Sequence, residues 1–242
     1  MKIFEIVYFN LRYFLPSLNL FIYKKVKHLA RLKGNDVSLL DIGGRKSHYT
    51  INIPAEITVT DIPRESNIQV KLNLGVNENI INQLYSRRSN IKDYLIDHMV
   101  DTKLPKKSFD IVIAIEVLEH VEEDKTFINN VYDTLKPGGI YFMTTPNGDH
   151  VENTNPDHIR HYTKKQLFSI LTSRFEIVDI EYAIYEDQKY FHSLKSWDLG
   201  NPFQTIRSIY SSIVNNYHSN YSKNPLYAKN SRHLSAVCRK AP

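Results

Sequence analysis

Short apolar runs alternate with segments of helical periodicity along most of this chain. Six runs have the length and composition of buried strands, at residues 37–42, 57–61, 109–115, 140–145, 175–182 and 234–239. Strands that are apolar throughout are typical of a mostly parallel sheet, because helices cover both of its faces. The pattern therefore predicts an α/β fold.

The segments between these runs have the spacing of amphipathic helices. Helical periodicity covers residues 3–32 with a break near Pro16, and it returns at 80–88, 121–135 and 203–215. We expect Pro137-Gly138-Gly139 to end the third of these helices. Thr163-Lys164-Lys165-Gln166 has the form of a capping box and predicts another helix to about Ser173.

Composition narrows the class of protein. A chain of 242 residues can bury one sizeable core, which favours one α/β domain with extensions. The single cysteine, Cys238, excludes an intramolecular disulfide and any zinc site built from several cysteines. Its apolar neighbours indicate a buried structural thiol, and we expect a reducing compartment, the cytoplasm.

The charge balance is mildly basic, with 31 Lys and Arg against 26 Asp and Glu and a formal net charge of +5. Such an excess can attract nucleic acid, anionic lipid or a phosphorylated substrate, or it can be an ordinary solvated surface. The basic residues are scattered and form no concentrated stripe. We therefore expect no nucleic-acid partner.

The N-terminal segment is rich in aromatic and aliphatic residues but is not a membrane span. Polar residues and a proline interrupt residues 3–23, and no basic start or small-residue cleavage site indicates a secretory signal. A basic flank follows, consisting of Lys24, Lys25, Lys27 and Arg31. Residues 3–31 could thus contact the inner face of a membrane peripherally, or form a leading helix packed against the domain.

Two strands end in residues suited to a nucleoside ligand. Asp41-Ile42-Gly43-Gly44 closes the first strand, where glycine allows the backbone to turn tightly and approach a ligand. Asp61 ends the second strand twenty residues later, where a carboxylate can accept hydrogen bonds from both ribose hydroxyls. The loop Gly43–Ser47 matches neither the phosphate-binding nor the dinucleotide-binding fingerprint.

Six motifs in order carry a resemblance to a known family. They are Leu39-Leu40-Asp41-Ile42-Gly43, Val59-Thr60-Asp61, Leu104-Pro105 with Ser108–Val112, Glu116–Val121, Leu135–Gly139, and Thr144-Thr145-Pro146-Asn147. Over roughly residues 36–183 the chain resembles class I S-adenosylmethionine-dependent methyltransferases of the type 11/23 kind. The resemblance implies a Rossmann-like three-layer sandwich with a mostly parallel seven-stranded sheet and an antiparallel last strand. It also implies S-adenosyl-L-methionine as cofactor.

The same resemblance implies roles for residues at the strand ends. Gly43 and Gly44 would lie beneath the amino-acid end of the cofactor, Asp61 would hold its ribose, and Asp101 would lie near the adenine amino group. The full expected cofactor set is Asp41, Gly43, Gly44, Asp61, Ile62, Asp101, Ile115 and Glu116. Arg45 and Ser47 stand where the family usually has glycines.

Histidines and glutamates after the later strands are candidates for the chemistry. His120, His158 and His161 are possible general bases, because an imidazole titrates near neutral pH. Glu116, Glu119 and His120 would share one face of a helical turn, and with His158 they could bind Mg²⁺ or Mn²⁺. A similar set binds metal in small-RNA 2′-O-methyltransferases, and its first part resembles ubiquinone-pathway O-methyltransferases. The alternative is that Glu119 and His120 only fix the turn, as in metal-free relatives.

We expect four segments: an N-terminal helical extension (1–35), a cofactor-binding core (36–184), an insertion forming an acceptor lid (185–231) and a final core strand (232–242). The expected lid contains Tyr185, Tyr190, Phe191, His192 and Trp197. The expected activity is O-methylation of a sugar or polysaccharide intermediate or a small metabolite. An RNA 2′-O-methyltransferase and a non-catalytic S-adenosylmethionine-binding partner module are the alternatives. The sequence leaves the oligomeric state open.

Overall fold

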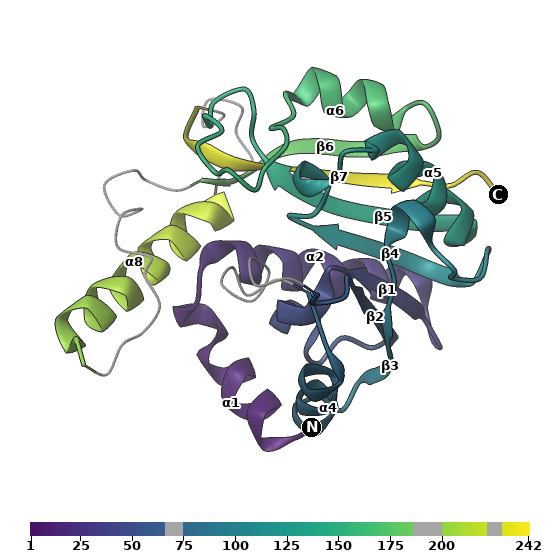
Figure 1. Cartoon of the computed structure of the whole chain (residues 1–242). Helices are drawn as coiled ribbons and strands as arrows, with labels where there is room; N and C mark the ends of the chain where they lie inside the picture. The colour runs from purple at the N-terminus through teal and green to yellow at the C-terminus, as the bar shows by residue number, and fades with distance from the viewer. Residues whose placement is uncertain (66–74, 186–199, 222–228) are drawn as a thin grey trace.

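Within the residues that the structure describes, seven strands form one twisted sheet (Figure 1). The structure is a computed structural model, and it describes residues 1–65, 75–185, 200–221 and 229–242. The strands are β1 (Ser38–Ile42), β2 (Glu56–Asp61), β3 (Ile91–Ile96), β4 (Phe109–Ile115), β5 (Leu135–Pro146), β6 (Glu176–Tyr185) and β7 (Ser231–Arg239).

The strand order is β3-β2-β1-β4-β5-β7-β6. All neighbouring pairs from β3 to β5 are parallel, whereas β7 is antiparallel to both β5 and β6. The Rossmann-like α/β fold with an antiparallel last strand is therefore confirmed. The strand order changes its sense between β1 and β4, because the chain first adds β2 and β3 on one side of β1 and then β4 and β5 on the other. Ligands bind at such a topological switch point in sheets of this kind.

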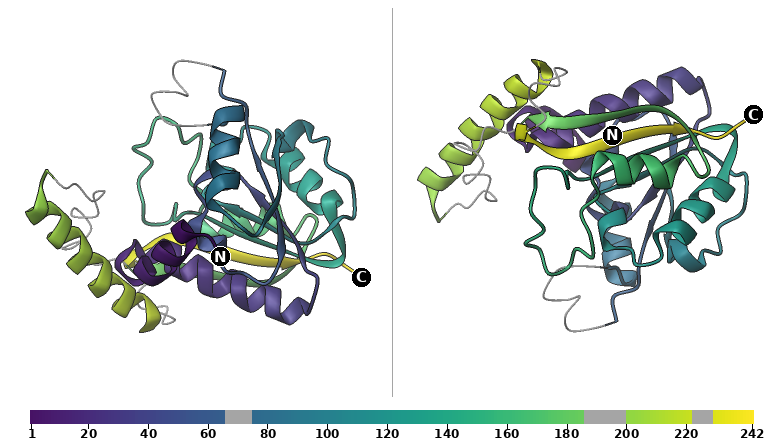
Figure 2. Two further views of the ribbon diagram at one scale, coloured as in Figure 1. Left: turned by 90° about the horizontal axis from the view of Figure 1, so that it is seen from below. Right: turned by 90° about the horizontal axis from the view of Figure 1, so that it is seen from above.

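Helices cover both faces of the sheet (Figure 2). The α-helices are α1 (Ile3–Leu11), α2 (Ser17–Lys33), α4 (Glu78–Arg87), α5 (Asp124–Thr134), α6 (Lys164–Leu171) and α8 (Pro202–Tyr221). Short 3₁₀ turns lie between them, namely η1 (Arg12–Phe14), η2 (Gly44–Lys46), η3 (His48–Thr50), η4 (Met99–Asp101) and η5 (Leu118–His120).

Consecutive residues of the central strands point into two separate cores. In β1, Leu39 packs into the cluster that includes α2, whereas Leu40 packs into the cluster that includes α5 and α6. In β4, Ile111 and Val112 divide in the same way. The cause is the two-residue period of a strand, which places alternate side chains on opposite faces. This explains why the central strands are apolar throughout.

Most predicted elements are confirmed within a few residues, including the break between α1 and α2 before Ser17. Thr163 caps α6 through a reciprocal pair with Gln166, as its capping box predicts. Cys238 is buried in β7, and burial raises the pKa of its thiol to about 12.

Two parts of the sequence interpretation need correction. No strand was predicted at Ile91–Ile96, which forms the edge strand β3 and has only Tyr94 buried, so its apolar pattern is weak. Pro137-Gly138-Gly139 does not end α5. The helix ends at Thr134, and Leu135 already begins β5, because the residues after it pair with β4.

The predicted insertion at 185–231 separates two neighbouring strands, β6 and β7. Of this segment the structure describes mainly α8, which confirms the helix predicted at 203–215. Tyr190, Phe191, His192 and Trp197 lie outside the described residues, as does the side chain of Tyr185. Among the helices described, none combines the length and the apolar character that a membrane crossing requires.

Candidate functional site

The candidate site lies at the carboxyl ends of β1, β2, β4 and β5, where the parallel strands end on one side of the sheet (Figure 1). Residues of the sequence motifs lie at or directly after the ends of these strands: Gly43-Gly44, Asp61-Ile62, Glu116–His120 and Asn147. Because parallel strands run in one direction, these residues meet at a common edge. The fold thus assembles the motifs that are dispersed over about a hundred residues of sequence.

The glycine turn after β1 has a shape that other residues would not adopt. Gly43 has φ of +69°, and its N–H donates to Thr60 O at 2.8 Å. A Cβ on Gly43 would lie 2.9 Å from Val117 Cγ2, and one on Gly44 would lie 2.5 Å from Asp41 Cγ. The Asp41 carboxylate is therefore buried directly behind Gly44, where it supports the turn and offers no surface to a ligand.

The rest of this loop is ordered by hydrogen bonds although it lacks the family's further glycines. Ser47 is buried, and its hydroxyl donates to Gly44 O at 2.6 Å. The Arg88 guanidinium donates to Ser47 O at 2.8 Å from the end of α4. These contacts hold the loop in a defined shape, with Arg45 and Ser47 at the positions where the family usually has glycines.

Asp61 ends β2 as predicted and lies beside this loop. One of its carboxylate oxygens accepts the Ile62 N–H at 2.8 Å. Burial raises the pKa of Asp61, while the Ile62 N–H and the nearby Arg45 act in the opposite direction. A partly buried carboxylate in this position can accept hydrogen bonds from the two hydroxyls of a ribose.

The other predicted cofactor residues occupy different surroundings. Ile115 is half-buried at the end of β4, and Ile62 is half-buried directly after β2. Asp101 lies in η4 with 81% of its side chain exposed, and its carboxylate pairs with Lys103 Nζ at 2.9 Å. The structure thus places Asp101 on the surface, paired with a lysine.

Glu116 follows β4 in a conformation uncommon for a residue with a side chain, with φ of +54°. Its carboxylate lies 3.1 Å from His233 Nδ1, a residue of β7. Burial acts to raise the pKa of Glu116, but the His233 imidazole and the Thr144 hydroxyl outweigh it and lower the pKa. His233 was not among the predicted site residues, because it is more than a hundred residues away and only strand pairing brings it here.

Glu119 is fully buried in the 3₁₀ turn η5. Among the described residues, neither of its carboxylate oxygens accepts a hydrogen bond of normal geometry, although the Thr145 hydroxyl lies near enough to favour the charged form. Burial, and then the neighbouring Glu116, raise its pKa well above the usual range. A buried carboxylate of this kind is costly to keep charged unless a cation or donor reaches it.

The three predicted histidines lie together beside Glu119. The His158 Nδ1 atom is 2.8 Å from His161 Nε2, and the rings of His120 and His158 meet edge to face with centroids 4.7 Å apart. His161 Nδ1 lies 3.0 Å from Val151 O, and His120 Nδ1 lies 2.9 Å from Asp157 O. The loop that carries them is tied to η5, because the Ile159 N–H donates to Glu119 O at 2.8 Å.

These contacts assign the neutral tautomers of the histidines. A carbonyl oxygen can only accept, so His161 and His120 must each carry their proton on Nδ1. His161 Nε2 is then an acceptor, and His158 must donate to it from Nδ1. As a result, Nε2 of both His120 and His158 has an unshared electron pair that can take a proton or bind a metal ion.

The structure brings together three of the four predicted metal ligands. One ligand atom each of Glu119, His120 and His158 lies within 4.8 Å of the other two. Glu116 is not part of this group, because its carboxylate is paired with His233. Arg160, between the two histidines of this loop, donates to the Asp124 carboxylate at 2.7 Å.

Comparison with known proteins identifies what this chain is similar to. A family model described as a methyltransferase domain matches residues 14–212. A probable S-adenosylmethionine-dependent methyltransferase of Mycolicibacterium smegmatis is 30% identical over 88 residues, which are 34% of each chain. A ubiquinone biosynthesis O-methyltransferase of Rickettsia bellii is 30% identical over 115 residues, 47% of this chain and 43% of that protein. The chain thus spans about a third to a half of the length of these two relatives.

Solved structures with the same fold differ widely in sequence. The N-methyltransferase NodS of Bradyrhizobium japonicum, in complex with S-adenosyl-l-homocysteine, has a TM-score of 0.54 and 16% identity, covering 91% of this chain and 86% of its own. The [4+2]-cyclase SpnF has a TM-score of 0.56 and 18% identity, covering 90% of this chain and 80% of its own. A cyclase and a methyltransferase share this fold, so the reaction has to be argued from the site.

Proposed function

Since this chain belongs to the class I S-adenosylmethionine-dependent methyltransferases, we propose that it methylates a hydroxyl oxygen. The proposed acceptor is a sugar, a polysaccharide intermediate or another small hydroxylated metabolite. The observation that carries this proposal is the histidine cluster, in which two imidazole Nε2 atoms have unshared electron pairs. A hydroxyl is a weak nucleophile and needs its proton removed as it reacts, whereas a neutral amine needs less help. The relatives described as ubiquinone biosynthesis O-methyltransferases support oxygen as the acceptor atom.

The ends of β1 and β2 fit the cofactor. S-adenosylmethionine supplies a methyl group on a positively charged sulfur, and transfer breaks that carbon–sulfur bond to leave S-adenosylhomocysteine. Only glycine fits at both positions of the Gly43-Gly44 turn, since a Cβ on Gly43 would meet Val117 and one on Gly44 would meet Asp41. The backbone of the turn therefore carries no side chain that could stand between it and the cofactor. In this proposal the Asp61 carboxylate accepts hydrogen bonds from the ribose hydroxyls, which its position at the end of β2 and beside the glycine turn supports.

The histidine cluster fits the removal of the proton from the acceptor hydroxyl. We assign His158 as the base: its Nε2 takes the acceptor's proton while the oxygen forms its new bond to carbon. The imidazolium that results keeps its Nδ1–H bond to His161. Burial, and then the neighbouring His120 and His161, lower the pKa of His158, while the negative charge of Glu116 acts in the opposite direction. His161 is a positioning residue, since its bond to Val151 O fixes the ring that orients His158.

Replacement of the histidines tests this assignment. With a panel of phenols and sugars as acceptors, His158→Ala should lower the rate of S-adenosylhomocysteine formation by about a hundredfold or more. Affinity for S-adenosylhomocysteine, measured by calorimetry, should stay nearly unchanged, because His158 is not part of the glycine turn. His150→Ala is the control, since His150 is exposed and lies outside the cluster. An undiminished rate in His158→Ala would refute the assignment.

The same cluster also fits a divalent cation, which when bound would act as a Lewis acid that lowers the pKa of the acceptor hydroxyl. Glu119, His120 and His158 would hold it, and it would satisfy the buried Glu119 carboxylate, which accepts no hydrogen bond of normal geometry from the described residues. Two imidazoles with one carboxylate favour Mn²⁺ over Mg²⁺, because Mg²⁺ prefers oxygen ligands. In that form His158 is a ligand rather than the base.

A direct binding measurement decides between the two forms. If the ion belongs to this site, calorimetric titration with Mn²⁺ should show binding to the wild-type protein, and Glu119→Gln should abolish it. Glu122→Gln changes an exposed carboxylate nearby and should bind Mn²⁺ like the wild type. Absence of binding, or equal binding by Glu119→Gln, would leave His158 as a metal-free base.

A further inference from the structure

The helix α8 exposes its apolar side and buries its polar side, which is the reverse of most surface helices. Its large apolar residues face outward: Phe203 is 85% exposed, Ile206 64% and Tyr217 62%, with Tyr210 and Ile213 between them. Its small polar residues face the protein and are buried, namely Ser208, Ser211, Ser212, Asn215 and Asn216. A helix normally buries its apolar side, so an exposed apolar stripe of this size indicates a surface that something else covers.

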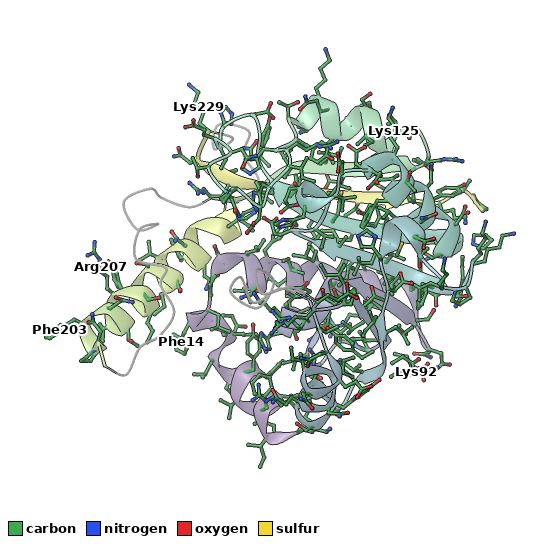
Figure 3. All side chains as sticks on the ribbon, viewed as in Figure 1. Phe14, Lys92, Lys125, Phe203, Arg207 and Lys229 are labelled. Atoms are coloured by element: carbon green, nitrogen blue, oxygen red, sulfur yellow. The ribbon has the colours of Figure 1, made fainter. Side chains whose placement is uncertain are left out.

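A second exposed apolar surface lies next to α8. On α1 and η1, Ile3, Ile6, Val7, Tyr13 and Phe14 are exposed. The two surfaces are held together, because the Asn216 amide of α8 donates to Tyr13 O at 2.8 Å and to Leu15 O at 3.2 Å. Figure 3 shows Phe203 and Arg207 extending from α8, with Phe14 on the side of α1 that faces it.

The charged residues of these helices are mainly basic. Residues 1–35 contain seven lysines and arginines, and their one carboxylate, Glu5, is buried. The helix α8 adds Arg207 and has no acidic residue. Some of these cations have protein partners: Lys25 pairs with Glu181, and Lys33 donates to Gly138 O at the far end of α2. The two segments together still contain eight lysines and arginines against one carboxylate.

We propose that the exposed apolar residues of α1, η1 and α8, together with the cations beside them, bind the surface of an anionic lipid bilayer. Aromatic and aliphatic side chains would enter the boundary between headgroups and acyl chains, and the lysines and arginines would lie at the headgroups. A second copy of this chain is a less favourable partner for this surface, because two such faces would bring like charges together. In Figure 1, β4 and β5 run toward the side of the molecule where α8 lies, so the candidate site opens on the side of this surface.

Vesicle sedimentation tests the proposal without any measurement of activity. The wild-type protein should sediment with vesicles of phosphatidylcholine and phosphatidylglycerol, bind much less to phosphatidylcholine alone, and be released as salt is raised. The double variant Phe203→Ser/Ile206→Ser should bind the anionic vesicles about tenfold less, or weaker still. Phe168→Ser is the matched control, since Phe168 is an exposed aromatic residue on α6, and it should bind like the wild type.

Two further measurements distinguish a loss of lipid binding from misfolding and from a loss of cofactor binding. Circular dichroism and S-adenosylhomocysteine affinity should be the same in the double variant and the wild type, so a failure of lipid binding is separate from a failure of the methyltransferase proposal. The proposal is overturned if the wild-type protein stays in solution with anionic vesicles, or if the double variant binds them equally. It is also overturned if light scattering shows a dimer that the double variant dissociates.

Discussion

Asp41 shows how a single buried carboxylate can shape the loop Gly43–Ser47, called the cofactor loop below. It is fully buried behind Gly44, and burial raises its pKa to about 7, although the Ser47 hydroxyl and the Arg88 guanidinium favour its charged form. In the unfolded chain its pKa returns to the ordinary value of an aspartate, about 3.8. Between these values the folded protein binds a proton that the unfolded chain has lost. The stability that Asp41 contributes is therefore complete below about pH 4 and is lost as the pH rises toward 7.

Replacement of Asp41 by its neutral isostere should remove this pH dependence. Between about pH 5 and pH 8, the melting temperature of Asp41→Asn should rise relative to that of the wild type, because the variant has no proton to lose. Thermal melts followed by circular dichroism measure the difference. Asp93→Asn, which alters an exposed carboxylate on β3, should follow the wild type. Parallel curves for Asp41→Asn and wild type would show that Asp41 does not titrate in this range.

At the scale of elements, α1 is fastened to the cofactor loop by a buried polar network. The Glu5 carboxylate accepts hydrogen bonds from the Ser89 N–H at 2.9 Å and the Ser89 hydroxyl at 2.7 Å, and it lies 3.7 Å from Arg88 Nε. Arg88 in turn donates to Ser47 O at 2.8 Å and to the Thr50 hydroxyl at 2.9 Å. The N-terminal helix is thus coupled to the loop that follows Gly44.

Removal of Glu5 should weaken both the fold and the cofactor loop. Glu5→Ala leaves the buried Arg88 without its carboxylate, and we expect the free energy of unfolding to fall by about 2 kcal/mol. Denaturant titration measures this loss, and calorimetry should show weaker S-adenosylhomocysteine binding. Glu122→Ala is the control for removing a carboxylate at the surface. Unchanged stability and affinity in Glu5→Ala would show that α1 is not coupled to the loop.

At the scale of the whole molecule, the site depends on the complete sheet. Its residues come from the ends of β1, β2 and β4, from the loop after β5, and from β7, which carries His233. β7 lies between β5 and β6, so a strand near the end of the sequence forms part of the sheet next to the candidate site. A ligand that binds at this edge joins many parts of the fold, and its binding energy adds to the stability of the folded state.

S-adenosylhomocysteine should therefore raise the melting temperature. At about a hundred times its dissociation constant the added stability is about 2.7 kcal/mol, which corresponds to roughly 5 to 10 °C for a chain of this size. Asp61→Ala should lose most of this shift, because it removes the carboxylate that we propose holds the ribose. Asp101→Ala should keep it, since that side chain pairs with Lys103 at the surface. Loss of the shift in Asp101→Ala alone would place the adenine contact at Asp101 instead.

Much of the fold and part of the site follow from local sequence. The apolar runs determine the buried strands because a strand covered on both faces needs apolar residues at every position, as β4 illustrates. Gly43 and Asp61 could be found because each directly follows such a strand. The edge strand β3 could not, since Tyr94 is its one buried residue and leaves little pattern to detect.

Other features were decided only by the tertiary structure, because they depend on residues far apart in sequence. Pairing of β7 with β5 brings His233 to Glu116, and the carbonyl groups of Val151 and Asp157 determine which nitrogens of His161 and His120 carry protons. The sequence alone predicts that α8 has one apolar and one polar side, but its periodicity is the same whichever side faces the protein. Packing of α8 against α2, β6 and η1 turned its polar side inward and left the apolar side exposed.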